Sequence, residues 1–245
     1  MIKVLVNGAK GRMGTHVVAT VESETDLELV AATDLGDDLS ACIASSGAEV
    51  VVDFTQPDCA YSNSEEILKA GACPVIGTTG FAASDVERLR VLSRELGVGG
   101  VIAPNFSIGA LLVMKFAAEA ARYFPDVEII ELHHDQKADA PSGTAIKTAE
   151  WIAESRGEHR SGPEKEQETI PGARGGRLKG IPIHSVRLPG YVAHEEIVFG
   201  GQAQILSLRH DSMSRECFMP GVALVARKVR ELDHVVYGLE NLLEL

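Results

Sequence analysis

Long hydrophobic runs are missing from this chain of 245 residues. No apolar stretch approaches the roughly 18 to 20 residues that a membrane-spanning helix needs. The N-terminus also lacks the basic segment, apolar stretch and small-residue cleavage site of a secretory signal peptide. We therefore expect a cytoplasmic protein with no membrane partner.

Basic clusters are missing as well. Lys and Arg total 23 against 35 Asp and Glu, which gives a formal net charge of -12. A nucleic-acid-binding surface needs a basic stripe that displaces counterions from the phosphates. The acidic composition therefore predicts that nucleic acid is not a partner.

Cysteine is scarce and widely spaced. The four cysteines, Cys42, Cys59, Cys73 and Cys217, form no Cys-x-x-Cys pair, and the sequence has no His-Glu-x-x-His motif. A disulfide framework or a zinc site would need such spacings. We expect four reduced, structural thiols and no metal.

Hydrophobic residues make up 45% of the chain and charged residues 24%, as in soluble globular proteins. The length allows one large domain or two modest ones. Short β-branched runs alternate with helical stretches in the first hundred residues, which predicts a Rossmann-type parallel sheet covered by helices on both faces. The expected strands are residues 2–7, 27–33, 50–54, 74–76 and 100–103, and the expected helices are 12–22, 59–70 and 83–96.

The pattern changes after residue 105. We expect helices at 108–123, 142–154 and 219–231, and strands at 127–133, 183–188, 195–199 and 205–210. The last three strands follow one another closely, which predicts a second, α+β domain with an antiparallel or mixed sheet. Residues 155–180 form a long polar loop in this prediction, either mobile or functional.

A glycine-rich segment follows the first expected strand. It comprises Gly8, Ala9, Lys10, Gly11, Arg12, Met13 and Gly14. The glycines would allow a sharp turn, close approach of a pyrophosphate and tight helix packing, with helix N–H groups attracting the anion. The spacing differs from the usual G-x-G-x-x-G, so the motif alone is weak. Asp34, about 20 residues after Gly14, ends the second strand where an acidic residue would bind the adenosine ribose. The alternative is a plain turn with an ordinary strand-end aspartate.

Two further turns follow the fourth and fifth strands. They contain Gly77, Thr78 and Thr79, and Ala103, Pro104, Asn105 and Phe106. The carboxyl ends of parallel strands form the edge where open α/β sheets bind ligands. We expect both turns to line a nicotinamide pocket, although each could be an ordinary turn.

The densest cluster of reactive side chains contains His133, His134 and Lys137 and precedes a small-residue helix start at Ser142, Gly143 and Thr144. If Pro141 occupies the first helical turn, the three N–H groups that follow it are unpaired and bind an anion, with Lys137 adding a charge. Such a site suits a carboxylate. Adjacent histidines on a strand face opposite ways, so one could act on the ligand while the other braces the loop. A purely structural histidine pair is the alternative, and a lysine neighbour disfavours a metal.

These segments closely resemble the dihydrodipicolinate reductase family, also called 4-hydroxy-tetrahydrodipicolinate reductase, nearly from end to end. The resemblance rests on residues 8–14, 53–55, 77–81, 103–107, 131–134 and 139–145, the last two carrying the most specific motif. It implies a dinucleotide-binding domain of residues 1–106 and 216–245. It also implies a substrate domain of residues 107–215, whose mixed sheet builds a homotetramer, with hinges at 106–107 and 214–217.

The resemblance also implies residue roles. His133 becomes the catalytic histidine and Lys137 the proton-donating lysine, while His134, Ser142, Gly143 and Thr144 become substrate contacts, with Lys137 also holding a carboxylate. The implied reaction, in lysine and diaminopimelate biosynthesis, transfers hydride from NADH or NADPH to C4 of a dicarboxylate. The product is tetrahydrodipicolinate, with loss of the 4-hydroxyl as water and a proton delivered to C3.

The sequence departs from the family at one position that concerns the cofactor. Relatives that favour NADPH carry an arginine after the acidic residue of the second strand, whereas Leu35 follows Asp34 here. A carboxylate suits the ribose hydroxyls of NADH and repels a 2′-phosphate, although Lys10 or Arg12 could partly compensate. We expect NADH to be favoured, or both cofactors to be used.

Two other functions compete with the reductase. One is a non-catalytic NAD(P)-sensing protein of the same fold, against which the intact His133, Lys137 and helix start at 142–144 argue. The other is a two-domain dehydrogenase of an amino acid or a semialdehyde. A semialdehyde enzyme would need a nucleophilic cysteine, and no cysteine lies near the second-domain motifs.

Overall fold

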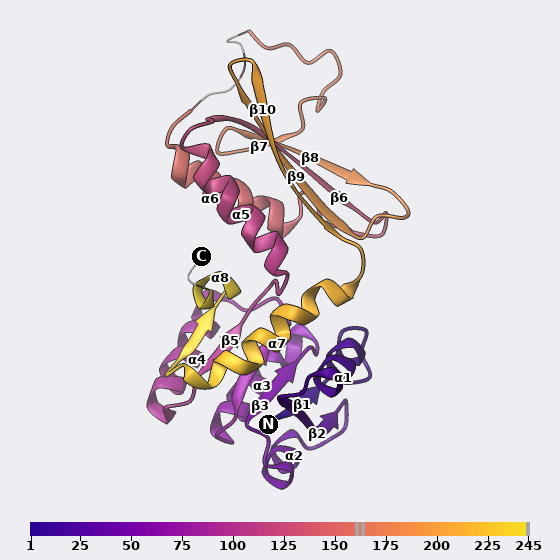
Figure 1. Ribbon diagram of the computed structural model, residues 1–245, viewed down its shortest axis with the longest axis vertical. Helices are drawn as coiled ribbons and strands as arrows, with labels where there is room; N and C mark the ends of the chain where they lie inside the picture. Colours follow the sequence, from indigo (N-terminus) through magenta and orange to yellow (C-terminus); the bar gives the residue numbers. More distant parts are fainter. Residues whose placement is uncertain (160–161, 163–164, 244–245) are drawn as a thin grey trace. The chain divides into compact units, whose positions relative to one another are not determined.

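The computed structural model describes residues 1–159, 162 and 165–243. The chain folds into two compact units. The first contains Met1–Ile108 and the chain from Arg215 onward, and the second contains Gly109–Ser214. The divisions lie beside the boundaries that the sequence suggested, at 106/107 and 215/216. Figure 1 labels most of the elements of both units.

The first unit contains a six-stranded parallel sheet in the order β11-β5-β4-β3-β1-β2. The strands are β1 Ile2–Asn7, β2 Leu27–Thr33, β3 Val50–Asp53, β4 Cys73–Ile76, β5 Gly100–Ile102 and β11 Val235–Tyr237. From β1 the chain first adds β2 on one side and then β3 on the other. The topological switch point therefore lies between β1 and β3, at whose carboxyl ends such sheets bind ligands.

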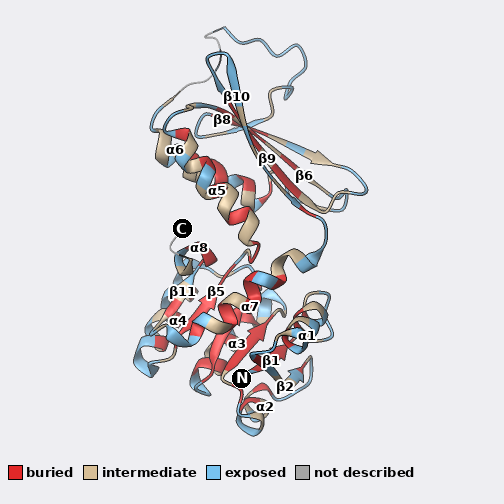
Figure 2. Cartoon of the chain, in the orientation of Figure 1, coloured by how far each residue is buried: buried red, intermediate tan, exposed pale blue. Residues whose placement is uncertain are grey.

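Helices cover both faces of this sheet, as the continuous apolar runs predicted (Figure 1). They are α1 Gly14–Ser23, α2 Leu39–Ser46, α3 Pro57–Lys69, α4 Ala83–Leu96, α7 Met219–Lys228 and α8 Leu239–Leu242, with 3-10 turns at Arg215–Phe218 and Val229–Glu231. Figure 2 shows buried residues gathered in the sheet and on the helices packed against it. Among them, Val4, Val6 and Val51 are completely buried. The apolar stripe of α7, including Val222 and Val225, is buried against α1 and the sheet. The last long helix therefore belongs to the first unit.

The second unit contains a five-stranded mixed sheet in the order β10-β9-β6-β8-β7, in which only β6 and β8 run parallel. Its strands are β6 Asp126–His133, β7 Gly176–Leu178, β8 Ile181–Arg187, β9 Ala193–Gly201 and β10 Gln204–Ser212, and its helices are α5 Ile108–Ala121 and α6 Gly143–Arg156. One sheet face packs on the helices in a core that includes Ile129, Ile152 and Phe199. The mixed sheet expected from the sequence is confirmed.

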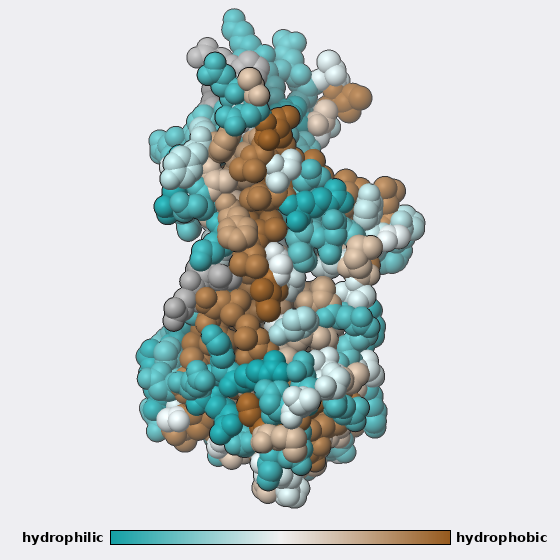
Figure 3. All heavy atoms as spheres, in the orientation of Figure 1, coloured by the Kyte–Doolittle hydropathy of each residue, from teal (hydrophilic) through white to brown (hydrophobic). Residues whose placement is uncertain are grey.

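The opposite sheet face is only partly covered. Alternate residues of the strands lie there, including the half-buried Ile130, Leu132, Val186 and Val198. On the helix side of this unit, Figure 3 shows hydrophobic residues gathered over α5, where Phe116 has half of its surface exposed.

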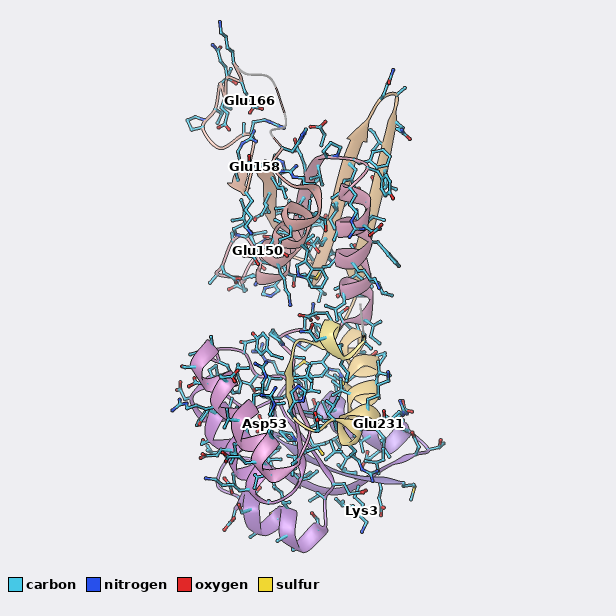
Figure 4. The ribbon with its side chains drawn as sticks, turned by 90° about the vertical axis from the view of Figure 1, so that its left-hand side faces the viewer. Lys3, Asp53, Glu150, Glu158, Glu166 and Glu231 are labelled. Carbon is cyan, nitrogen blue, oxygen red and sulfur yellow. The ribbon has the colours of Figure 1, made fainter. Side chains whose placement is uncertain are left out.

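The structure adds elements that the sequence did not reveal. They are α2, β7, β11 and α8. The expected loop at 155–180 contains the end of α6 and strand β7, while residues 160, 161, 163 and 164 lie outside the described residues. Glu166 (Figure 4) accepts hydrogen bonds from Arg174 at 2.8 Å and Arg177 at 2.6 Å, which holds this segment against β7. β7 has no β-branched residue and exists through its pairing with β8.

No helix in the described residues is long and apolar enough to cross a membrane.

Candidate active site

The glycine-rich turn after β1 is shaped by close backbone approach. The N–H groups of Gly8 and Ala9 donate to the Thr33 carbonyl at 2.9 and 3.0 Å, and Gly8 has a φ of +78°. A Cβ at Gly14 would lie 2.0 Å from the Gly8 oxygen, so only glycine lets α1 begin there. The helix starts two residues later than the sequence suggested, because Gly11 first closes a turn onto Gly8.

Asp34 lies directly beside this turn, as expected. Its carboxylate accepts hydrogen bonds from the Lys10 N–H at 2.7 Å and the Leu35 N–H at 2.8 Å. The bonds from Leu35 and Lys10 lower the pKa of Asp34, so the group stays ionised at neutral pH. The Leu35 side chain is fully exposed. The Asp34 carboxylate therefore lies next to the glycine-rich turn, and the side chain at position 35 beside it is open to solvent.

The two other turns of the first unit meet through an aromatic pair. A Cβ at Gly77 would lie 1.9 Å from the Phe54 ring, so this position must be glycine. The Phe54 ring centroid lies 5.7 Å from that of Phe106. Thr78 donates to the Thr55 carbonyl at 3.2 Å, and Ala103 donates to Ile76 at 2.9 Å.

These contacts bring both expected nicotinamide turns together at the carboxyl edge of the sheet. Within them Pro104 and Thr79 are exposed. Asn105 instead accepts from the Ser107 N–H at 2.8 Å and braces its own turn.

A buried polar network lies beneath these turns, and sequence reasoning gave it no role. Asp53, fully buried at the end of β3 and labelled in Figure 4, accepts from Asn7 and Asn63 at 2.8 Å each and from the Thr55 hydroxyl at 2.6 Å. Thr33 donates to Asn7 at 2.9 Å. The network ties together the carboxyl ends of β1, β2 and β3. An aspartate ending an otherwise apolar strand was the available signal.

In the second unit, a carboxylate holds the expected catalytic histidine. His133 and Glu131 lie two residues apart on β6 and so share a face. The His133 Nδ1 lies 2.5 Å from Glu131 Oε2. The guanidinium of Arg187 on β8 donates to both Glu131 oxygens, at 2.7 and 2.8 Å. The Ser142 N–H adds a fourth hydrogen bond at 3.2 Å.

The electrostatics of this cluster fix the state of Glu131. Burial raises the pKa of Glu131, but the hydrogen bonds from His133 and Arg187 outweigh it and lower the pKa to about 2. An ionised carboxylate only accepts hydrogen bonds. The His133 Nδ1 therefore carries a hydrogen, which leaves Nε2 as the nitrogen for proton exchange with a ligand.

Lys137 follows on the turn after β6. Its Nζ lies 2.7 and 2.9 Å from the two Asp139 oxygens, and this hydrogen bonding lowers the pKa of Asp139. Arg187 donates to the Asp139 carbonyl at 2.7 Å, which fixes the turn to the Glu131 cluster. His134 is exposed. The turn thus presents a cation and a second imidazole next to His133.

Pro141 does not lie in the first helical turn, so the condition for three free N–H groups is not met. The helix N-cap is Ser142, so Pro141 precedes α6, and the Ala140–Pro141 bond is cis. The Ser142 N–H is also not free, because it donates to Glu131, while its hydroxyl accepts from Ala145 at 3.2 Å.

The anion-binding donors at this helix start are therefore fewer than expected. They reduce to the N–H groups of Gly143 and Thr144, which have no carbonyl partner within the helix. A Cβ at Gly143 would meet no atom of the described chain within 4 Å.

Three residues of this region escaped the sequence analysis. Glu131 was visible as a charge inside an apolar strand two residues before a histidine. Asp139 lay within the motif without a role. Arg187 lies far from His133 in the sequence, and only the parallel pairing of β6 with β8 brings the two residues opposite each other.

Comparisons with known proteins cover nearly the whole chain. The family model for the N-terminus of dihydrodipicolinate reductase matches residues 2–106, and the model for its C-terminus matches 109–243. A 4-hydroxy-tetrahydrodipicolinate reductase of Coxiella burnetii (strain Dugway 5J108-111) is 51% identical over 242 residues, covering 99% of each chain. The Listeria welshimeri enzyme of that name is 50% identical over 263 residues, covering 99% of this chain and 100% of its own.

Solved structures agree with the sequence comparisons. A dipicolinate-bound dihydrodipicolinate reductase from Paenisporosarcina sp. TG-14 has a TM-score of 0.92 and 45% identity, covering 98% of this chain and 99% of that chain. An amine dehydrogenase from Mycobacterium smegmatis, at 12% identity and a TM-score of 0.64, shares the fold alone. The chain belongs to the dihydrodipicolinate reductase family.

Proposed function

We propose that this protein reduces 4-hydroxy-tetrahydrodipicolinate to tetrahydrodipicolinate and water with a nicotinamide nucleotide. The observation that carries the proposal is the cluster at the end of β6. It combines an imidazole oriented by Glu131, the adjacent ammonium of Lys137 and a helix start with two open N–H groups. A dicarboxylate that must receive a proton needs these groups.

The first unit fits a dinucleotide. Side chains at Gly8, Gly14 and Gly77 would collide with backbone or ring atoms, so glycine at these positions lets the turns at the carboxyl edge of the sheet pack closely. Residues 8–13 would hold the pyrophosphate and Asp34 the adenosine ribose. The turns 77–79 and 103–106 would hold the nicotinamide, which when bound supplies a hydride.

The second unit would bind the substrate. The N–H groups of Gly143 and Thr144 and the ammonium of Lys137 suit a carboxylate, because a helix start and a full positive charge both favour an anion. Ser142 and His134 lie beside them. The Paenisporosarcina relative binds dipicolinate, a planar dicarboxylate, which supports a ligand of this class.

His133 would deliver the proton. Glu131 holds Nδ1, so the ring can turn only its Nε2 toward the carbon that becomes C3 of the product. Lys137 would assist as a second proton source and as the partner of a substrate carboxylate. Asp139 releases Lys137 to that carboxylate when substrate binds.

A homotetramer built through the mixed sheet fits the uncovered sheet face. Half-buried apolar residues such as Ile130 and Val198 lie there in a row, and a second copy would remove them from water. A cytoplasmic location fits a biosynthetic enzyme whose four cysteines are free thiols.

The test is to follow NADH absorbance with purified protein and substrate freshly made by the preceding synthase. Steady NADH consumption that depends on substrate supports the proposal. Binding of NADH without consumption would instead favour the non-catalytic NAD(P)-sensing protein.

A further inference from the structure

A second buried carboxyl group lies beside the Glu131 cluster and has no part in the proposed chemistry. Glu195 on β9 pairs in register with Glu131 on β6 and with His210 on β10. Directly paired residues share a sheet face, so Glu195 lies on the face that carries Glu131 and His133. Its exposed fraction is 7%, and that of Glu131 is 0%.

The two carboxyl groups have different hydrogen-bond partners. Glu131 is surrounded by donors from His133, Arg187 and Ser142. Glu195 has one hydrogen-bond partner, the Thr148 hydroxyl on α6, which lies 3.2 Å from Oε2 and also donates to the Thr144 carbonyl at 2.9 Å. Its other oxygen, Oε1, is buried and has no hydrogen-bond partner within the described part of the chain. An ionised carboxylate in that position would be poorly compensated.

The groups around Glu195 supply no compensating cation. On β6 it faces the Glu131 carboxylate, whose charge already engages Arg187. On β10 it faces His210, and burial lowers the pKa of that imidazole and so favours its neutral form.

The remaining neighbours of Glu195 do not reverse this balance. On β9 itself His194 and Glu196 lie on the opposite face, paired with Asp211 and Arg209. From α6 comes the neutral Thr148, and the buried residues of α5 are all apolar. Burial raises the pKa of Glu195 to about 7, against the Thr148 hydrogen bond, and the charge of Glu131 raises it further.

We propose that Glu195 is a positioning residue, held as a neutral carboxylic acid beside Glu131, whose ionisation sets the upper pH range of His133 as a proton donor. With Glu195 neutral, Glu131 is the single negative charge next to the imidazole. Ionisation of Glu195 adds a second negative charge and holds the proton on the ring more firmly. The proposal rests on the proposed role of His133.

Glu195→Gln tests this assignment, because the amide has nearly the same shape and cannot ionise. The readout is the pH titration of the His133 ring by NMR on isotopically labelled protein, with its signals assigned by their loss in His133→Asn. The wild-type ring signals show two steps, one from the ring and one from Glu195. Glu195→Gln shows one step.

Two further variants complete the titration. Glu196→Gln is the matched control, since it lies next in sequence but on the opposite sheet face, and it retains both steps. Thr148→Val removes the hydroxyl that contacts the Glu195 carboxyl group, so the second step moves to a different pH. Thr148→Val also tests the proposal without any change at Glu195.

The reaction supplies a second readout. The alkaline limb of the kcat profile lies at lower pH in Glu195→Gln than in the wild type. The expected shift is about half a pH unit, because the variant lacks the charge of Glu195 on the strand next to His133. A merely structural role for Glu195 would leave the limb in place. One-step titration in the wild type, or superimposable profiles of wild type and Glu195→Gln, would overturn the proposal.

The two proposals fail separately. The ring titration requires no turnover, so it supports or overturns the coupling whatever His133 does in the reaction. An unchanged kcat in His133→Ala alongside a two-step ring titration would remove His133 from the mechanism and leave the coupling standing.

Discussion

At the scale of single residues, the site depends on charges that are held by neighbours. Glu131 holds His133, Asp139 holds Lys137, and two backbone N–H groups hold Asp34. His133, Lys137 and Asp34 could be recognised as candidate site residues from the sequence, because each belongs to a local motif. Arg187, which holds Glu131, could not be found in this way, since it approaches only through the pairing of β6 with β8.

Lys137→Ala is expected to lower kcat/KM by about 10²-fold or more, because it removes a cation for a carboxylate and a proton source. Lys137→Arg should restore little, since the guanidinium has a different shape and does not give up its proton. Steady-state kinetics of both variants measure this. Full recovery with arginine would mean that Lys137 acts only as a charge.

Leu35→Arg is expected to shift the cofactor preference toward NADPH. The wild type should use NADH at least as well as NADPH. Because Asp34 would repel a 2′-phosphate, kcat/KM should favour NADH by roughly fivefold. The side chain at position 35 is fully exposed, so arginine costs no packing. Leu35→Gln is the neutral control. A wild type that prefers NADPH more than about tenfold would show that Lys10 or Arg12 outweighs Asp34.

At the scale of elements, the sequence predicted the strands and helices of both units well where apolar periodicity was strong. It failed at α2, whose serines and alanines give a weak stripe, and at β7, which depends on its partner strand. It expected three free N–H groups at the start of α6 if Pro141 lay in the first helical turn. Ser142 instead caps the helix through its hydroxyl, and its N–H donates to Glu131.

Gly143→Ala tests the start of α6. The added methyl group meets no atom of the described residues within 4 Å, and alanine favours a helix, so stability should hold or rise. If a substrate carboxylate binds the N–H groups there, the methyl group displaces it and KM rises roughly tenfold or more. Thermal unfolding and steady-state kinetics together measure the two effects. An unchanged KM would place the carboxylate elsewhere.

At the scale of the whole molecule, buried charge links the site to stability. The folded pKa of Glu131 is about 2, against an ordinary value of 4.5. A lowered pKa contributes stability above pH 4.5 that is lost as pH falls toward 2, worth at most roughly 3 kcal/mol.

This contribution can be isolated with Glu131→Gln. The difference in unfolding free energy between wild type and Glu131→Gln should shrink as the pH falls from 4.5 toward 2. Urea unfolding at several pH values measures it. A difference that does not vary with pH would show that the carboxylate is not held as described.

The central claim is that this chain transfers hydride to its substrate and protonates it through His133. The most direct measurement uses NADH deuterated at the transferred position, with the product mass and kcat compared between wild type and His133→Ala. We predict one deuterium in the wild-type product and a kcat about 10²- to 10⁴-fold lower in His133→Ala, with little change in NADH affinity. Bound NADH without deuterium transfer, or a variant retaining most of the wild-type kcat, would contradict the account.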